Sequence, residues 1–301
     1  MGLKSRKKIE LKNDLWNSFQ SYNQLCSLAY TIEIANAEKI TLDLRDVKFI
    51  ASNLFSVLGC ILDSFYQKHT EDSEALILSG IRPGIKTIVQ KNGFCHHLGL
   101  EKIADVYNTV IPYKIFDVDE IDEYERYLTL SLFGRKDLPA MSLAMSDKFR
   151  DALLEIFNNV RDHTSSRNVF TCGQYFPQGQ MLYFTIVDAG ETIPYNVREY
   201  HIRQGLSVPS KSLEWATEPG NTTLIERTPR GIGLSIIMDF VSLNEGEFFM
   251  VSGEEMLEIT KKGKMYNKLD NPFRGTIVTI GFNMNDKSLY FINEEHETIQ
   301  F

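Results

Sequence analysis

One segment of the chain combines an apolar helical pattern with polar residues at a fixed spacing. Glu155, Asn159 and His163 follow one another at intervals of four residues, and residues four apart lie on one face of an α-helix. The sequence therefore predicts a helix whose polar stripe is half-buried against a pocket or the core, although ordinary surface or capping contacts would give the same spacing. Apolar residues flank the stripe, namely Leu153, Leu154, Ile156, Phe157 and Val160.

The polar stripe carries groups suited to metal-assisted chemistry. A carboxylate one turn from an amide oxygen, as in Glu155 and Asn159, suits a hard cation that keeps most of its waters. The same carboxylate could take a proton from an attacking water or hydroxyl. His163 lies at the predicted helix end, where capping or packing explains it as well as contact with a phosphate does.

A second motif is a strand that ends in an acid. The apolar and β-branched run Met181–Val187 predicts a buried strand, followed by Asp188 and a turn at Gly190. An acid at the end of a buried strand can accept a hydrogen bond from an exocyclic amine. The alternative is a common strand-terminating Asp-x-Gly turn.

Two glycine motifs follow. Gly231 and Gly233 precede an amphipathic helix that is predicted to run to about Leu243. Glycines let the backbone approach a phosphate, and a helix N-terminus presents free N–H groups to it. Later, Gly275-Thr276 opens an alternating strand that reaches Ile280.

In this order the motifs resemble the boxes of the GHKL ATPase superfamily, the ATP-binding domains of DNA gyrase, heat-shock chaperones, histidine kinases and MutL. Glu155 and Asn159 match E-x-x-x-N, and Asp188 begins the D-x-G match. The resemblance covers about residues 143–282 and implies a two-layer α/β sandwich of the Bergerat type over 143–301. Thr192 replaces the second glycine of the family's D-x-G-x-G, which leaves the local backbone path open. The later matches are Gly231, Gly233 and Leu234 for G-x-G-L, and Gly275-Thr276.

The resemblance implies a role for each matched residue. Asp188 would accept from the adenine amino group of ATP, with Thr276 assisting through water. Asn159 would ligate Mg²⁺ between the phosphates, and Glu155 would be the catalytic general base. The other implied contacts to ATP come from Gly190, Thr192, Gly231, Gly233 and Leu234, with Arg230 and Lys211 as candidates for phosphate contact.

Residues 195–230 are rich in turn signals, with a short helix expected around 213–217. Structureless loops of this length are usually functional or disordered. In the superfamily this position holds the lid that closes over ATP, so the resemblance implies a lid here. The alternative is an insertion without function.

Residues 1–110 alternate strand and helix patterns, which predicts an α/β layer. Helices are expected over 11–36, 52–68 and 81–93, and strands over 39–44 and 75–78. The stretch 41–100 resembles the STAS domain of anti-sigma-factor antagonists, which implies a mixed sheet with helices. The family's phosphorylated serine lies in D-S-S-G or D-S-T-G, whereas Ser52 stands in Ala-Ser-Asn-Leu. Ser52 is therefore interpreted as a helix cap rather than a phosphorylation site. The segments that carry this resemblance are Leu42–Leu44, Val47–Ser52 and Leu76–Ile81.

Composition and charge limit the partners and the compartment that we expect for this chain. Residues 1–110 hold 13 Lys and Arg against 12 Asp and Glu, whereas the remainder holds 19 against 28. The acidic half is the predicted ATP-binding half, so Mg²⁺ and backbone N–H groups should hold the phosphates, and duplex nucleic acid is not expected as a partner. Four widely spaced cysteines and the absence of an apolar run of membrane length favour a cytoplasmic protein with no membrane partner. Residues 111–142 are expected to form a linker and a connecting helix.

Three functions fit these patterns. The first is a cytoplasmic Mg-dependent ATPase whose lid closure regulates a protein partner through the STAS-like half. The second is a serine/threonine protein kinase of the anti-sigma-factor type; a histidine kinase is disfavoured because residues 112–150 contain no histidine. The third is a nucleotide-binding switch that does not hydrolyse ATP. A homodimer is compatible with all three.

Overall fold

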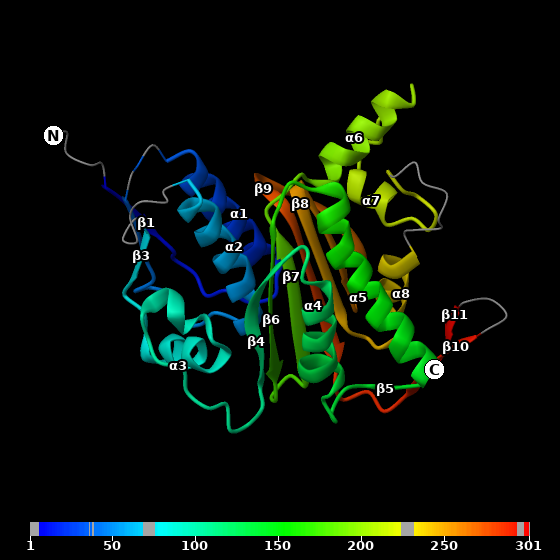
Figure 1. The fold of residues 1–301 in the computed structure, drawn as a ribbon, viewed down its shortest axis with the longest axis horizontal. Coiled ribbons are helices and arrows are strands. Elements are labelled where there is room, and N and C mark those ends of the chain that lie inside the picture. The colour runs from blue at the N-terminus through cyan, green and yellow to red at the C-terminus, as the bar shows by residue number, and fades with distance from the viewer. Residues whose placement is uncertain are drawn as a thin grey trace.

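The computed structural model of the chain describes residues 6–35, 37, 39–68, 76–223, 232–293 and 298–300. The protein is a mixed α/β fold, as the sequence predicts, built around a five-stranded antiparallel sheet of order β4-β6-β7-β9-β8 (Figure 1). The strands of this central sheet are β4 (Val110–Asp117), β6 (Asn168–Phe176), β7 (Met181–Asp188), β8 (Glu247–Thr260) and β9 (Gly263–Asn283).

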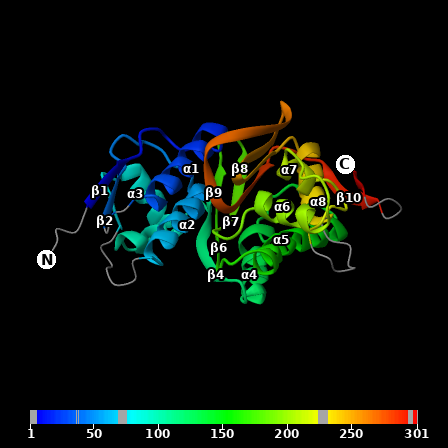
Figure 2. The ribbon, with the colours of Figure 1, turned by 90° about the horizontal axis from the view of Figure 1, so that it is seen from above.

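Both faces of the central sheet are buried. Side chains alternate between the faces along a strand, so Leu182 and Phe184 of β7 enter one core and Val187 enters the other. Figure 2 shows helices on each side of the sheet. This explains why 181–187 is rich in apolar and β-branched residues on both faces instead of alternating with exposed polar residues. One face carries α4 (Ile121–Leu128), α5 (Leu143–His163) and α8 (Ile232–Leu243), and the other carries α1 (Phe19–Glu33) and α2 (Phe55–Tyr66).

A second, smaller sheet covers the far side of α1 and α2. Its strands are β1 (Arg6–Glu10), β2 (Lys39–Asp43) and β3 (Leu76–Ser79), in that order and all parallel. The mixed sheet implied for this half is therefore not found among the described residues. The reason is that α1 and α2 return the chain to the starting edge between strands, which makes neighbouring strands parallel.

Several shorter elements complete the fold. The third helix, α3 (Pro83–Asn92), has proline in its first turn and ends at Gly93 with a φ of +93°, as the sequence predicts. A third, peripheral sheet joins β5 (Ala140–Met141), β10 (Leu289–Asn293) and β11 (Thr298–Gln300). None of the helices in the described ranges is long and apolar enough to span a bilayer.

The two halves of the chain share one core. Leu25 of α1 and Leu58 of α2 belong to the same buried cluster as Phe170 of β6 and Phe249 of β8. The predicted linker over 111–142 is also different in the structure, because most of β4 lies within it and forms the edge of the central sheet. The connecting helix is present as α4, which packs beside α5 on the same face of the central sheet.

A buried polar ladder fixes the N-terminal half against the central sheet. The Asn53 amide donates to Thr185 Oγ1 of β7 at 2.9 Å, and Thr185 shares a 2.8 Å hydrogen bond with Thr279 of β9. The Tyr22 hydroxyl of α1 donates to Thr279 Oγ1 at 2.7 Å. Since all four residues are fully buried, these bonds specify one register of α1 and α2 on the sheet.

The structure corrects the interpretation of Ser52 as a helix cap. Ser52 begins the 3₁₀-turn η1 (Ser52–Leu54), and neither η1 nor α2 has a side-chain cap. Its hydroxyl accepts from the Asn92 amide at 2.9 Å, and its N–H donates to Gln174 Oε1 at 2.7 Å. The hydroxyl is turned toward α3 and is fully buried, so it is not presented to a kinase either.

Candidate functional site

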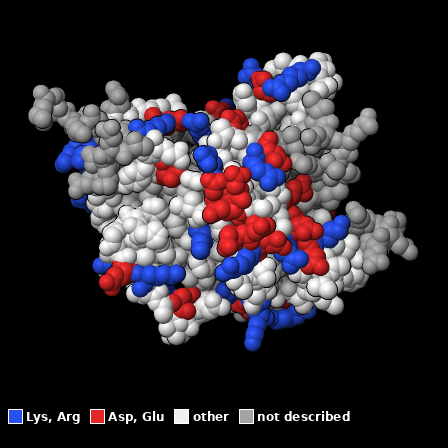
Figure 3. Space-filling model, viewed as in Figure 1, with Lys and Arg blue, Asp and Glu red and all other residues white. Residues whose placement is uncertain are grey.

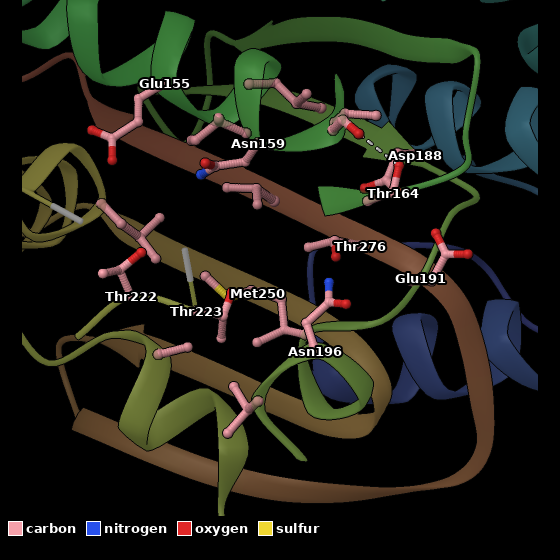
Figure 4. A pocket seen from close by; sticks show the side chains of 18 of the residues that line it. Glu155, Asn159, Thr164, Asp188, Glu191, Asn196, Thr222, Thr223, Met250 and Thr276 are labelled. Carbon is pink, nitrogen blue, oxygen red and sulfur yellow. Dashed lines mark hydrogen bonds between the residues drawn. The ribbon is translucent and has the colours of Figure 1, made fainter. Parts of the chain in front are cut away.

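The four sequence motifs converge on one cavity, named here the central cavity. It lies between α5, the end of β7, the interior of β9 and the start of α8 (Figure 4). Its wall includes Glu155 and Asn159 of α5, Asp188 of β7, Leu234 of α8 and Thr276 of β9. These residues are up to 121 positions apart in the chain, and the antiparallel sheet brings them together.

Strand alternation places Asp188 and Thr276 in the central cavity. Asp188 follows Ile186 by two residues on the α5 face, and it pairs directly with Thr276 in the β7–β9 register. Asp188 is only 4% exposed, and its Oδ1 accepts from the N–H of Gly190 at 2.8 Å.

Two glycines allow the chain to close around Asp188. A Cβ on Gly190 would lie 2.2 Å from Thr164 Cβ, and a Cβ on Gly275 would lie 2.1 Å from the Asp188 carbonyl oxygen. Gly275 also has a φ of +99°, in the left-handed region that favours glycine. Gly190 is therefore a positioning residue for Asp188, and it does not itself line the cavity.

Burial raises the pKa of Asp188 to about 7, although N–H groups of Gly190 and Thr276 oppose the shift. The unfolded chain should lose this proton near the ordinary value of 3.8, so the folded state binds more protons between about pH 4 and 7. We therefore expect the free energy of unfolding to fall as pH rises through that window. Between pH 5 and 8, the free energy of unfolding of the wild type should fall by about 2–3 kcal/mol relative to that of Asp188→Asn. Denaturant titrations at the two pH values measure this difference. A constant difference between the two proteins would contradict this assignment.

The α5 stripe forms the opposite wall. Ser142 caps α5 by accepting from the N–H of Met145 at 3.2 Å, and the helix ends at His163, as predicted. Glu155 is half-buried and Asn159 is exposed at the cavity rim. The side chain of His163 lies outside the described residues.

Gly233 joins α8 to this wall. Its N–H donates to Glu155 Oε2 at 2.9 Å. A Cβ at Gly233 would lie 2.4 Å from that oxygen and 3.0 Å from Ala152 Cα. The glycine is therefore needed for the packing of α8 on α5, independently of any contact with a ligand. Arg230 and Gly231 lie outside the described residues.

The predicted lid segment is partly helical. Its sequence shows turn signals, yet α6 (Ile193–Arg203) is a regular helix and α7 (Ser212–Ala216) is the expected short one. Thr192 caps α6 by accepting from the N–H of Tyr195 at 3.2 Å, and it does not line the cavity. The turn signals of this segment all lie after α6, at 209–213, 218–223 and 228–230, and Pro194 just before the segment lies in the first turn of α6, where no N–H is needed.

A carboxylate from the central sheet anchors α7. The Glu255 oxygens of β8 accept from the N–H groups of Ser212 and Leu213 at 3.1 and 2.8 Å. Lys211, a candidate phosphate ligand, instead lies 3.6 Å from Glu214 and does not line the cavity.

The lining of the central cavity is apolar with an acidic rim. Its three carboxylates are Glu155, Asp188 and Glu191, and none of the described lining residues is a lysine or arginine. Acidic side chains also gather on the outer face that carries α4 and α5 (Figure 3). A ligand with phosphates would therefore need a cation and backbone N–H groups. The apolar walls come from Ile156, Val160, Ile186, Val197, Met250 and Val278.

Sequence reasoning missed several lining residues. Thr164 and Glu191 lie in short loops, and Asn196 lies on α6, which was not predicted. Only the D-x-G match pointed toward Glu191, as the residue directly after Gly190. Three further residues of the lid segment line the cavity, Asn221, Thr222 and Thr223.

The chain matches no protein-family model, and comparison with curated proteins found no match. Among the described residues, no group of three or more His, Cys, Asp or Glu side chains is placed to hold a metal ion.

Proposed function

We propose that this chain is a Mg-dependent ATP-binding protein that hydrolyses ATP, with a C-terminal half of the GHKL type. The main support for this proposal is the position of Asp188, which is 4% exposed at the base of the central cavity. The opposite wall of the cavity holds Glu155 and Asn159. The antiparallel sheet with α5 and α8 on one face supports the Bergerat fold proposed for this half. The N-terminal half is proposed to be STAS-like, with a parallel sheet.

The cavity fits an adenine nucleotide in its chemistry. Asp188 offers an acceptor to an exocyclic amine in a site where an unpaired polar group is costly. Apolar side chains such as Ile186 and Met250 provide contact area for a planar base. Gly190 and Thr276 hold the carboxylate through their N–H groups, and Thr276 is placed to assist through water.

The phosphates would lie toward α5 and the start of α8. Asn159 supplies the amide oxygen proposed to hold Mg²⁺, which when bound neutralises phosphate charge in this acidic rim. The Gly233 N–H is taken by Glu155, so phosphate contact at this end is proposed for the neighbouring N–H groups at the start of α8. Leu234 lines the same end. Gly231 and Arg230 are proposed for phosphate contact on the resemblance alone.

Glu155 is proposed as the general base. Its carboxylate accepts a proton from an attacking water, a role worth about 10²- to 10⁴-fold in rate. The hydrogen bond from Gly233 fixes the orientation of one oxygen at 2.9 Å. The lid elements α6 and α7 cover the side of the cavity opposite α5, where Trp215 and Val197 contribute to its wall.

We further propose that nucleotide state is passed to a protein partner through the N-terminal half, in a reducing cytoplasm. The shared core and the polar ladder connect α1 and α2 directly to β7 and β9. These strands carry Asp188 and Thr276, which line the cavity. A shift of either strand on nucleotide binding would therefore move the N-terminal helices.

Glu155→Gln is expected to lower phosphate release from Mg-ATP by about 100-fold or more while leaving nucleotide affinity within about threefold. Glutamine keeps an oxygen that can accept from Gly233, so the fold should be preserved. Glu123→Gln, on the exposed surface of α4, is the matched control and should be unchanged. Unaltered phosphate release in Glu155→Gln would exclude Glu155 as the base.

The same assay separates the alternative functions. A serine/threonine kinase would transfer the label of γ-³²P-ATP to protein, because Glu155 could equally deprotonate a hydroxyl. A switch that does not hydrolyse ATP would bind Mg-ATP and release no phosphate above the Glu155→Gln background.

A further inference from the structure

A second cavity lies next to the central cavity, on the side of the central sheet that carries α1 and α2. It is bounded by the C-terminal ends of α1 and α2 and by the loops that precede β6 and follow β7. Its volume is about 510 Å³, within the range of about 300–1,000 Å³ seen for small-molecule sites. It lies at the junction of the two halves of the chain, a common place for such sites.

Short segments of the chain separate the two cavities, and neighbouring residues of each segment line one cavity or the other. In the first wall, Thr164 lines the central cavity and Ser165 and Ser166 line the second. In the second wall, Asp188 and Glu191 line the central cavity and Ala189 lines the second.

The strand β9 provides a third shared wall. Arg274 lines the second cavity, and Thr276, two residues further along, lines the central one. Gly275 separates them, and its lack of a side chain lets β9 approach the Asp188 carbonyl.

Hydrogen bonds connect these walls to one another. The Ser165 N–H donates to Glu191 Oε2, and the Ala189 N–H donates to Ser166 Oγ at 3.4 Å. Burial acts to raise the pKa of Glu191, but the bond from Ser165 and the charge of Arg274 lower it below its usual value. Arg274 of the second cavity is thus the smallest of the influences on Glu191, and the Ser165 N–H is the direct contact between the two walls.

The lining of the second cavity defines a ligand class. Its floor is apolar, with Ile32, Ile61, Phe65, Phe170 and Phe273. Its rim carries three cationic side chains, Lys68, Arg167 and Arg274. Three serines, Ser64, Ser165 and Ser166, also line it.

The neighbouring acids do not cancel all of these cations. Glu33 lies 3.8 Å from Lys68, which pairs one acid with one cation. Burial raises the pKa of Asp63, the other acid of the lining, against hydrogen bonds from Asn168 and Gln67. Arg167 lies 3.6 Å from Asp117, so among the described lining residues it is Arg274 that is left to attract an anionic head group.

We infer that the second cavity binds a small amphipathic anion, an apolar body with a carboxylate or phosphate head, and that its occupancy changes the affinity of the central cavity for nucleotide. The coupling rests on the proposed nucleotide function, whereas anion binding does not. Coupling is reciprocal, so nucleotide changes the affinity for the anion by the same factor.

Octanoate tests the first part, by isothermal titration of the full chain without nucleotide. We expect one-to-one binding with a Kd on the order of 1 mM or below, and no binding of octylammonium, which has the same chain and the opposite charge. Arg274→Gln should weaken octanoate about fivefold or more, whereas Arg126→Gln, an exposed arginine of α4, should not. Ala29→Trp, which fills the cavity from α1, should abolish binding. Equal binding of the two probes, or full binding to both Arg274→Gln and a folded Ala29→Trp, would overturn the site.

The second part is tested by titrating Mg-ATP with and without saturating octanoate. A change in the ATP Kd of about fivefold or more, with the reciprocal change for octanoate, supports the coupling. Unchanged constants for two ligands that both bind would overturn it. If Mg-ATP fails to bind at all, the nucleotide function and the coupling both fail, and the octanoate titration still decides the anion site.

Discussion

Replacement of Asp188 by asparagine is expected to weaken Mg-ATP binding about 10- to 100-fold, because a buried acceptor for the adenine amine is lost. The carboxylate is 4% exposed and is held by the Gly190 N–H at 2.8 Å. Asparagine keeps one oxygen for Gly190 but can direct an N–H₂ group at the exocyclic amine of adenine. The measurement is the Kd for Mg-ATP by isothermal titration, supported by circular dichroism to show an unchanged fold.

The matched control is Asp151→Asn, an exposed aspartate of the same helix, α5, that bears Glu155. It removes the same charge without touching the central cavity, so the Kd should stay within about twofold, as for a surface substitution. Equal weakening in both variants would mean that net charge, and not the buried acceptor, sets the affinity.

The second large effect concerns stability. Asn53→Leu should lower the free energy of unfolding by about 2–4 kcal/mol, because buried partners of a lost amide stay unsatisfied. The Asn53 amide is fully buried and donates to Thr185 Oγ1 at 2.9 Å and to Asn17 Oδ1 at 2.7 Å. Leucine matches the volume but offers neither bond. Chemical denaturation followed by circular dichroism measures the change.

Asn13→Leu provides the comparison for this variant. The Asn13 amide makes a surface hydrogen bond to Gln24 at 3.2 Å, and its replacement should change stability by less than about 0.5 kcal/mol. If Asn53→Leu were as stable as the wild type, the polar ladder would not determine how the N-terminal half docks on the sheet.

The elements that sequence predicted best carry strong local signals. The strand 181–188 and the helix that carries Glu155, Asn159 and His163 are present because apolar periodicity and a terminal Asp188 act within a few residues. The convergence of Glu155, Asn159, Asp188 and Thr276 on one cavity was also predictable, since the motif order implied one site.

What the sequence did not reveal depends on long-range contacts. Ser52 reads as a cap by local rules, yet Gln174 and Asn92, far away in the chain, take its hydrogen bonds. The edge strand β4 follows a turn at Asn108, whose φ is +49°, but it exists as a strand because β6 offers it a partner. The covering of the second sheet face by α1 and α2 has no signature in either half alone.

The most direct measurement is a titration of the full chain with ATP and with GTP in the presence of Mg²⁺. The proposal predicts one-to-one binding of ATP and at least about tenfold weaker binding of GTP, because guanine presents a carbonyl acceptor where adenine has its amine, and Asp188 is itself an acceptor. Absence of ATP binding at about 1 mM nucleotide, or equal affinity for the two nucleotides, would contradict the account.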